Sequence, residues 1–218
     1  MNFNSKAVSS SVSFKYDPFG RRIYKSSTAG TSIYAYDGAN IVEETNSSGA
    51  AVARYVQTKN VDEPLAILRS GATSYYEQDG LGSVTSLTNA AGTVAQTYTY
   101  DSFGNLIAST GSLINNFRYT GREFDTETGL YFYRARFYDP AAGRFVREDP
   151  AGFEAGLNFY RYAVNNPINF NDPFGLCPPS LKDRLALGFK GVVNLGIGVA
   201  KVAGGSAATA GTGGLAVG

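Results

Sequence analysis

The chain has 218 residues, of which 43% are hydrophobic and 17% charged, and a formal net charge of +1. This length suits one domain with an appendage, and the near-neutral charge argues against a nucleic-acid-binding region, which usually carries a basic excess. The sequence has no His and one Cys, Cys177, which excludes His-dependent catalysis, His-ligated zinc, an internal disulfide and a CxxC site, so we expect no metal and no cofactor.

The N-terminal residues 1–14 lack the basic-then-apolar pattern of a signal peptide. They also begin within a repeat pattern, and we therefore expect the chain to be an internal part of something longer. The 15 Tyr and 14 Phe residues favour strands, and the 26 Gly residues mark turns between them. The composition predicts a mainly β fold.

A motif of about twenty residues returns along the first half of the chain. Its leading tyrosines are Tyr16, Tyr36, Tyr55 (a degenerate copy), Tyr76, Tyr100 and Tyr119. A near-constant spacing of this size indicates a repeat architecture, in which neighbouring units bury one another's faces. Ordinary hairpins of a β-sandwich remain the alternative, which the regular spacing disfavours.

Each repeat is predicted to form a strand, a turn and a second strand. Residues 32–36 alternate with period two, which places Tyr34 and Tyr36 on the same face. Asp-x-x-Gly then provides the turn, because Asp accepts local backbone hydrogen bonds and Gly adopts conformations that other residues resist. The second strand follows, for example at residues 105–108.

The repeated Tyr-Asp-x-x-Gly-Arg/Asn-Leu/Ile pattern is similar to the YD repeats of Rhs proteins, wall-associated contact-dependent toxins, insecticidal toxin-complex C components and teneurins. The resemblance implies hairpins that join edge to edge into a long sheet, which spirals into a hollow shell. A sheet closed in this way exposes few of its edges. We expect residues 1–116 to form part of such a shell wall.

A denser pattern follows at residues 117–176 and resembles the Rhs repeat-associated core. Arginines stand beside aromatic residues throughout this segment. Alternation over residues 130–138 predicts one long strand that carries Arg134, Arg136 and Tyr138 on one face. These guanidinium groups could stack on rings or pair with carboxylates.

Two Asp-Pro-x-Gly motifs, which begin at Asp149 and Asp172, are the candidate site in this core. On the residues alone both are typical type I turns, with Asp at the first position, Pro at the second and Gly at the fourth. The same sequence begins at Asp17 in an ordinary repeat. Local sequence therefore leaves a structural turn and a catalytic site both open, and the turn is the commoner of the two.

The resemblance to the core implies that the two motifs supply an aspartic-protease-like pair. It assigns Asp149 and Asp172 as acid and base, associates Arg136 with them, and places the cut between Leu176 and Cys177. Two carboxyls that share a site cannot both ionise cheaply, so one can activate water while the other donates a proton. The core would then be a single-turnover, self-cleaving peptidase. A thiol mechanism through Cys177 is the alternative, which the absence of His disfavours.

Residues 177–218 are expected to be the start of a variable C-terminal toxin region. A Cys-Pro-Pro-Ser linker precedes apolar residues at helical spacing, which predicts a short helical tail. Packing of this tail inside the shell is favoured over contact with a membrane, because its longest uncharged run is short and rich in glycine. No nuclease, deaminase or transferase motif is present, so the toxin activity lies outside this chain.

The resemblance implies a protein that encapsulates a toxin and releases it in competition between bacteria. Its expected partners are its own toxin region as cargo, an immunity protein and a secretion-system component, with no nucleic acid bound by this region. It would be made in the bacterial cytoplasm and then secreted or delivered. A non-cleaving surface, adhesion or structural YD-repeat module is the rival function, and an inert gene fragment is a third alternative.

Overall fold

The computed structural model describes residues 11–176, which form two antiparallel sheets and three short 3₁₀ segments. The first sheet contains β1 (Ser13–Tyr16), β2 (Arg22–Ser27), β3 (Gly30–Asp37), β4 (Asn40–Thr45), β5 (Ala51–Gln57), β6 (Pro64–Arg69), β7 (Ala72–Gln78), β8 (Val84–Asn89), β9 (Val94–Tyr100) and β10 (Leu106–Thr110). The second contains β11 (Glu123–Asp125), β12 (Leu130–Tyr133), β13 (Arg136–Asp139) and β14 (Arg144–Phe145). The 3₁₀ segments are η1 (Tyr119–Gly121), η2 (Gly152–Ala155) and η3 (Ala163–Asn165).

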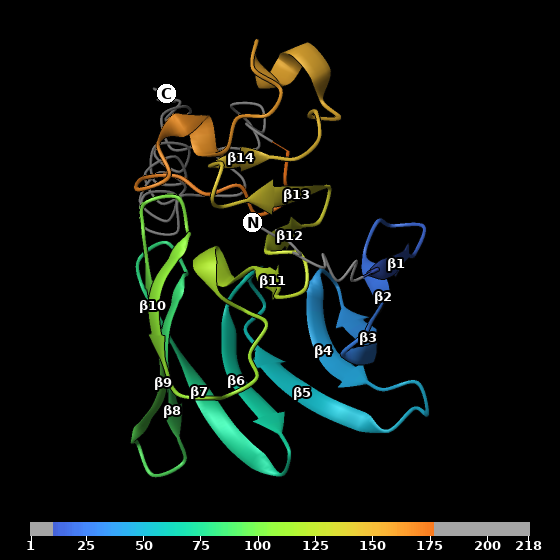
Figure 1. Ribbon diagram of the computed structural model, residues 1–218, viewed down its shortest axis with the longest axis vertical. Helices are drawn as coiled ribbons and strands as arrows, with labels where there is room; N and C mark the ends of the chain where they lie inside the picture. The colour runs from blue at the N-terminus through green and yellow to red at the C-terminus, as the bar shows by residue number, and fades with distance from the viewer. Residues whose placement is uncertain (1–10, 177–218) are drawn as a thin grey trace, which may run out of the picture. The chain divides into compact units, whose positions relative to one another are not determined.

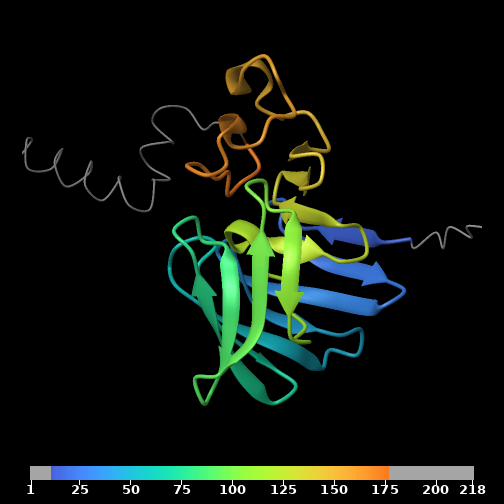
Figure 2. The same ribbon diagram turned by 60° about the vertical axis from the view of Figure 1, so that its left-hand side comes forward.

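Each strand of the ten-stranded sheet pairs only with its neighbours in sequence, so the sheet is a continuous meander from β1 to β10. Figures 1 and 2 show it as a curved wall, with β11–β14 at one end of it. The mainly β prediction is confirmed. The predicted hairpins are present as well, since residues 32–36 lie in β3 and Leu106 begins β10.

The turns between strands use one geometry many times. In the Asp17, Asp79 and Asp101 turns, Oδ1 accepts the backbone N–H groups two and four residues later. Asn46 and Asn89 make the same two bonds at the opposite ends of the hairpins. One side-chain oxygen is therefore enough to organise the turn, and a negative charge is not required.

The repeat tyrosines form the core of the wall. One face of the sheet buries Tyr34, Tyr55, Tyr76 and Tyr98 together with Leu87 and Val84. Three of the leading tyrosines also donate hydrogen bonds to backbone carbonyls of the preceding repeat: Tyr36 to Arg22, Tyr100 to Val84 and Tyr119 to Ser102. These three repeats thus each satisfy the hydroxyl of their leading tyrosine on the repeat before it.

One prediction about the core is wrong. Residues 130–138 do not form a single strand, because the chain turns back at Arg134 and Ala135 and pairs Tyr133 with Arg136. Arg134 has a φ of +54°, in the left-handed region, and this conformation closes the hairpin between β12 and β13. Arg136 and Tyr138 still alternate along β13, but Arg134 lies in the turn.

Buried ion pairs join the four-stranded sheet to the wall. Arg22 of β2 binds Glu123 at 2.6 Å and Asp125 at 2.5 Å, and all three side chains are almost fully buried. Tyr131 and Tyr138 donate to the carbonyls of Gly104 and Phe103 in the β9–β10 turn. The core therefore contacts both early and late repeats of the wall. The domain boundaries at residues 116 and 176 stay a prediction.

The predicted helical tail and Cys177 lie outside the described residues. Within residues 11–176, none of the helical segments has the length and hydrophobicity that crossing a membrane requires.

Candidate active site

Arg136, at the start of β13, is the centre of the candidate site. Its Nη2 lies 2.8 Å from Oδ2 of Asp149 and 3.4 Å from Oδ2 of Asp172. Both carboxylates therefore meet at one nitrogen atom, although the two aspartates come from separate loops. The side chain of Arg136 is 1% exposed, and those of the aspartates are 1% and 3% exposed. The structure thus brings the three predicted site residues together in the protein interior.

The remaining donors of Arg136 bind backbone carbonyls. Nε donates to Gly175 at 2.5 Å, and Nη1 donates to Phe159 at 2.9 Å. The guanidinium carbon lies 3.6 Å from the ring centroid of Phe145, a cation–π contact. The sequence did not predict the role of Phe145. Phe137 is adjacent to Arg136 in the sequence, but Arg136 stacks on the ring of Phe145, nine positions further along the chain.

Asp149 retains the turn that its sequence predicts and contributes its second carboxylate oxygen to the site. Its Oδ1 accepts the Ala151 amide at 2.9 Å, and its carbonyl accepts the Gly152 amide at 3.0 Å. Oδ2 is the atom that faces Arg136. The turn and the ion pair use different oxygens, so the structural and the catalytic interpretation of the motif are compatible.

Asp172 also uses one carboxylate oxygen for its turn and the other for Arg136, and it lies beside the predicted cleavage site. Its Oδ1 accepts the amide of Leu176 at 2.9 Å, while Oδ2 faces Arg136. The carbonyl of Asp172 accepts the Gly175 amide at 3.2 Å. The carboxyl group is thus attached by a hydrogen bond to the residue whose carbonyl the reaction would attack. Cys177, on the other side of that bond, is outside the described residues.

Leu176 also lines a hollow of ≈ 550 Å³ on the surface of the protein. Phe19 and Phe174 contribute its other large apolar side chains, and Leu176 is 39% exposed. The predicted cleavage residue therefore lies where the buried carboxyl pair meets a surface that water can reach.

Burial favours the protonated form of Asp172. Desolvation raises the pKa of Asp172 to about 6, and the charge of Asp149 adds to this rise. The hydrogen bond from the Leu176 amide and the charge of Arg136 act in the opposite direction. One cation faces two carboxyls here, so a proton on Asp172 keeps the buried cluster close to neutral.

Gly175 allows the second motif to approach the core closely. Its φ is +67°, and a Cβ at this position would overlap the Tyr133 carbonyl oxygen and lie 3.1 Å from the backbone nitrogen of Arg136. Gly20 ends the identical sequence in the first repeat with a φ of +77°, and no atom lies within 4 Å of the corresponding Cβ. The same turn is therefore open at one place and tightly packed at the other.

We expect Gly175→Ala to destabilise the protein more than Gly20→Ala. Both substitutions put an L side chain in the left-handed region, at a cost of about 1 to 2 kcal/mol. Gly175→Ala adds overpacking against backbone, worth about a further 1 to 3 kcal/mol. Urea unfolding of the two variants measures the difference. Equal losses would show that the Gly175 turn can move away from Tyr133.

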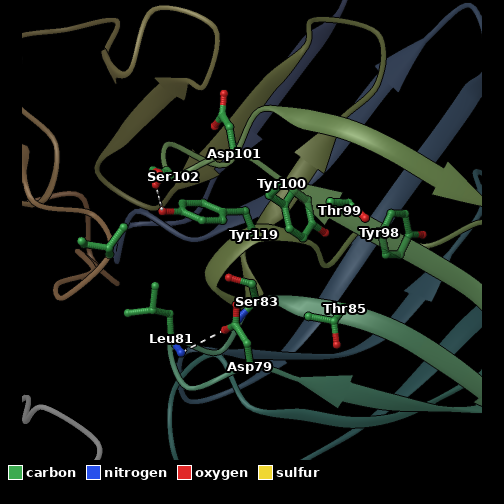
Figure 3. A pocket seen from close by; sticks show the side chains of 11 residues that line it. Asp79, Leu81, Ser83, Thr85, Tyr98, Thr99, Tyr100, Asp101, Ser102 and Tyr119 are labelled. Atoms are coloured by element: carbon green, nitrogen blue, oxygen red, sulfur yellow. Dashed lines mark hydrogen bonds between the residues drawn. The ribbon is translucent and has the colours of Figure 1, made fainter.

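A smaller hollow of ≈ 270 Å³ lies at the ends of β8 and β9, where Figure 3 shows the rings of Tyr119 and Tyr100 between Asp101 and Asp79. Its carboxylates are used by the turns described above, as the bond from the Leu81 amide to Asp79 in Figure 3 illustrates. In the described part of the chain, no group of three or more Cys, Asp or Glu side chains could hold a metal ion. The site at Arg136 is therefore the stronger candidate.

Comparisons with known proteins agree with this fold. The Teneurin YD-shell family model matches residues 3–168. The tRNA3(Ser)-specific nuclease WapA of Bacillus spizizenii is 32% identical over 173 residues, which are 75% of this chain and 7% of the relative. The double-stranded DNA deaminase toxin A of Burkholderia cenocepacia is 30% identical over 194 residues, with 75% and 14% covered.

Among solved structures, the Photorhabdus luminescens Tc holotoxin pore has a chain that superimposes with a TM-score of 0.63 at 25% identity. The match covers 78% of this chain and 9% of that one. The chain thus spans only a small part of each of these relatives, and the shared region has the same fold.

Proposed function

The chain belongs to the Teneurin YD-shell family and is an Rhs/YD-repeat toxin shell region, and from this membership we propose that it encloses a C-terminal toxin and releases it by cutting itself after Leu176. In this proposal residues 1–116 are wall, residues 117–176 are the cleaving core, and residues 177–218 begin the toxin. The toxin relatives support a cargo that follows the shell.

One observation carries the cleavage proposal: Arg136 holds the carboxylates of both Asp-Pro-x-Gly motifs at one atom, directly beside Leu176. A purely structural turn needs a single side-chain oxygen, as Asn46 and Asn89 illustrate. Burying two carboxyls against one arginine is costly, and catalysis is a reason to retain such an arrangement.

The reaction is an acid–base hydrolysis. Asp149, ionised, takes a proton from water, whose oxygen bonds to the carbonyl carbon of Leu176. Asp172, with its raised pKa, gives its proton to the nitrogen of Cys177 as the peptide bond breaks. The products are a new carboxyl group on Leu176 and a new amine on Cys177. Arg136 holds the two acids and, through the Gly175 carbonyl, the chain next to the scissile bond.

The test is an intact-mass time course on the 218-residue chain made by cell-free translation. A fragment that ends at Leu176, with a matching fragment that begins at Cys177, supports the proposal. Cys177→Ala should be cut at the same place, which excludes the thiol mechanism. A folded chain that stays at full mass supports the alternative, a non-cleaving surface, adhesion or structural module.

We expect cleavage to slow as the pH rises. Asp172 acts as the acid only when it is protonated, and its pKa of about 6 means that this form disappears above that pH. The rate constant should fall about tenfold for each pH unit above the pKa. Time courses at pH 5, 6, 7 and 8 provide the measurement. A rate that stays constant up to pH 8 would remove Asp172 from the role of proton donor.

The wider context of the proposal is competition between bacteria. The protein would be made in the cytoplasm and then secreted or delivered through a secretion system, and an immunity protein would protect the producing cell. Toxicity of the longer protein to neighbouring cells, and its loss in a cleavage-deficient variant, tests this context.

A further inference from the structure

Asp62 is a buried carboxylate outside the pair of aspartates. It lies in the loop between β5 and β6, and it is only 6% exposed. This loop belongs to the degenerate repeat that begins at Tyr55, where the usual Asp-x-x-Gly turn is missing. Places where a sequence departs from its own local rule are often functional, which makes the contacts of Asp62 informative.

Two arginines of the core converge on Asp62. Oδ1 lies 2.5 Å from Nη1 of Arg122 and 2.8 Å from Nη2 of Arg134, and Oδ2 accepts a bond from Arg134 at 3.2 Å. Burial by itself raises the pKa of Asp62, but the two arginine charges hold that pKa below its ordinary value. Asp62 is therefore a charged group, bound to the core from the wall.

Arg134 connects Asp62 to the motif of Asp172. Its Nη1 donates to the carbonyl of Pro173, and its guanidinium carbon lies 5.1 Å from the centroid of the Phe174 ring. The next residue of the same hairpin, Ala135, donates its amide to the Phe174 carbonyl at 3.2 Å. The turn that carries Asp172 is thus held on its outer side by Arg134 and on its inner side by Arg136.

The backbone at both members of this link is strained. Asp62 has a φ of +64° and Arg134 a φ of +54°, a region that residues other than glycine seldom adopt. The wall loop is fixed by its own bonds, such as those from Thr58 and Asn60 to Glu63. Strain of this kind persists where the surroundings determine the conformation, often at functional sites.

We propose that Asp62 is a positioning residue for self-cleavage: it orients Arg134, which in turn fixes the Asp172 turn against Arg136. This inference rests on the proposed function, and it adds a form of control. The core can cut only after the β5–β6 repeat of the wall has folded and presented Asp62. Release is thereby coupled to assembly of the wall.

The experiment measures the cleavage rate constant and its pH profile for Asp62→Asn and Arg134→Met in the full chain. We expect cutting to be about 10- to 100-fold slower in each, the range that small misplacement of a catalytic group produces. The falling limb of the pH profile should also move to lower pH, because a loosened turn exposes Asp172 to water. Arg134→Met leaves Asp62 paired with Arg122, so it tests the link if Asp62→Asn does not fold.

Glu44→Gln is the matched control. Glu44 is equally buried, and its partners Arg69, Tyr55 and Ser32 all belong to the wall. The substitution Glu44→Gln should lower the melting temperature and leave the pH profile of cleavage unchanged. Wild-type rates in folded Asp62→Asn or Arg134→Met would overturn this inference alone. If cutting is slower in Asp62→Asn or Arg134→Met but the pH profile is unchanged, as is expected for Glu44→Gln, Asp62 has only a structural role. An uncut wild type would overturn the proposed function, and this inference with it.

Discussion

Asp172→Asn should leave the bond between Leu176 and Cys177 intact, with a cleavage rate constant about 10² to 10⁴-fold below that of the wild type. The amide cannot donate a carboxylic proton to the leaving nitrogen. It can, however, keep the turn, because Asn46 and Asn89 accept the backbone amide four residues later in the same way as Asp172. The substitution therefore removes the chemistry and preserves the local fold.

Asp17→Asn is the matched control for this experiment. Asp17 begins the same four-residue sequence, Asp-Pro-Phe-Gly, and its Oδ1, like that of Asp172, accepts the backbone amide four residues later. Its Oδ2 binds Arg21 in a partly exposed pair and not a buried arginine shared with a second acid. This variant should be cut at the wild-type rate. The two intact-mass time courses are read side by side.

Two results would contradict the prediction. If Asp172→Asn is still cut after Leu176 at a comparable rate, the pair is not the catalyst. If Asp17→Asn is blocked as fully as Asp172→Asn, loss of cutting reflects a general need for these turns. In that case the loss of cutting would not show that the position of Asp172 beside Arg136 is needed for catalysis.

The wall could be predicted closely because its signals are local. Alternation with period two predicted the strands, and Asp-x-x-Gly predicted turns that one side-chain oxygen and a glycine with positive φ do form. The hairpin at Arg134 could not be predicted in this way. Its turn contains neither glycine nor proline, and it depends on a left-handed arginine that distant contacts hold in place.

The candidate site illustrates the same limit. The sequence Asp-Pro-Phe-Gly is identical at Asp17 and Asp172, so no local signal separates the exposed turn from the buried one. Only the resemblance to the Rhs core singled out Asp149, Asp172 and Arg136, and their catalytic role stays a prediction. Asp62 was not predicted at all, because its partners lie 60 and 72 residues away in the sequence. Its one local signal is the irregular repeat in which it lies.

Arg136→Met should stop cleavage and also lower the free energy of unfolding by about 3 to 5 kcal/mol at pH 8, the usual effect of breaking a buried ion pair by removing one partner. Without the guanidinium, two carboxyls remain buried beside each other, and the carbonyls of Gly175 and Phe159 lose their donor. Asp172→Asn, which should also be uncut, is the reference for urea unfolding. Arg21→Met, at the partly exposed pair with Asp17, should change stability little.

The loss of unfolding free energy in Arg136→Met should become smaller as the pH falls. The charge of Arg136 lowers the pKa of Asp172, so its removal raises that pKa further above about 6. A group whose pKa is raised by folding stabilises the folded state at low pH, and this stabilisation is lost as the pH rises through the folded value. The difference in the free energy of unfolding between Arg136→Met and the reference Asp172→Asn should therefore be smaller at pH 5 than at pH 8. A difference that does not depend on pH would mean that Arg136 contributes through packing on Phe145 and its carbonyl bonds, and not by neutralising the two acids.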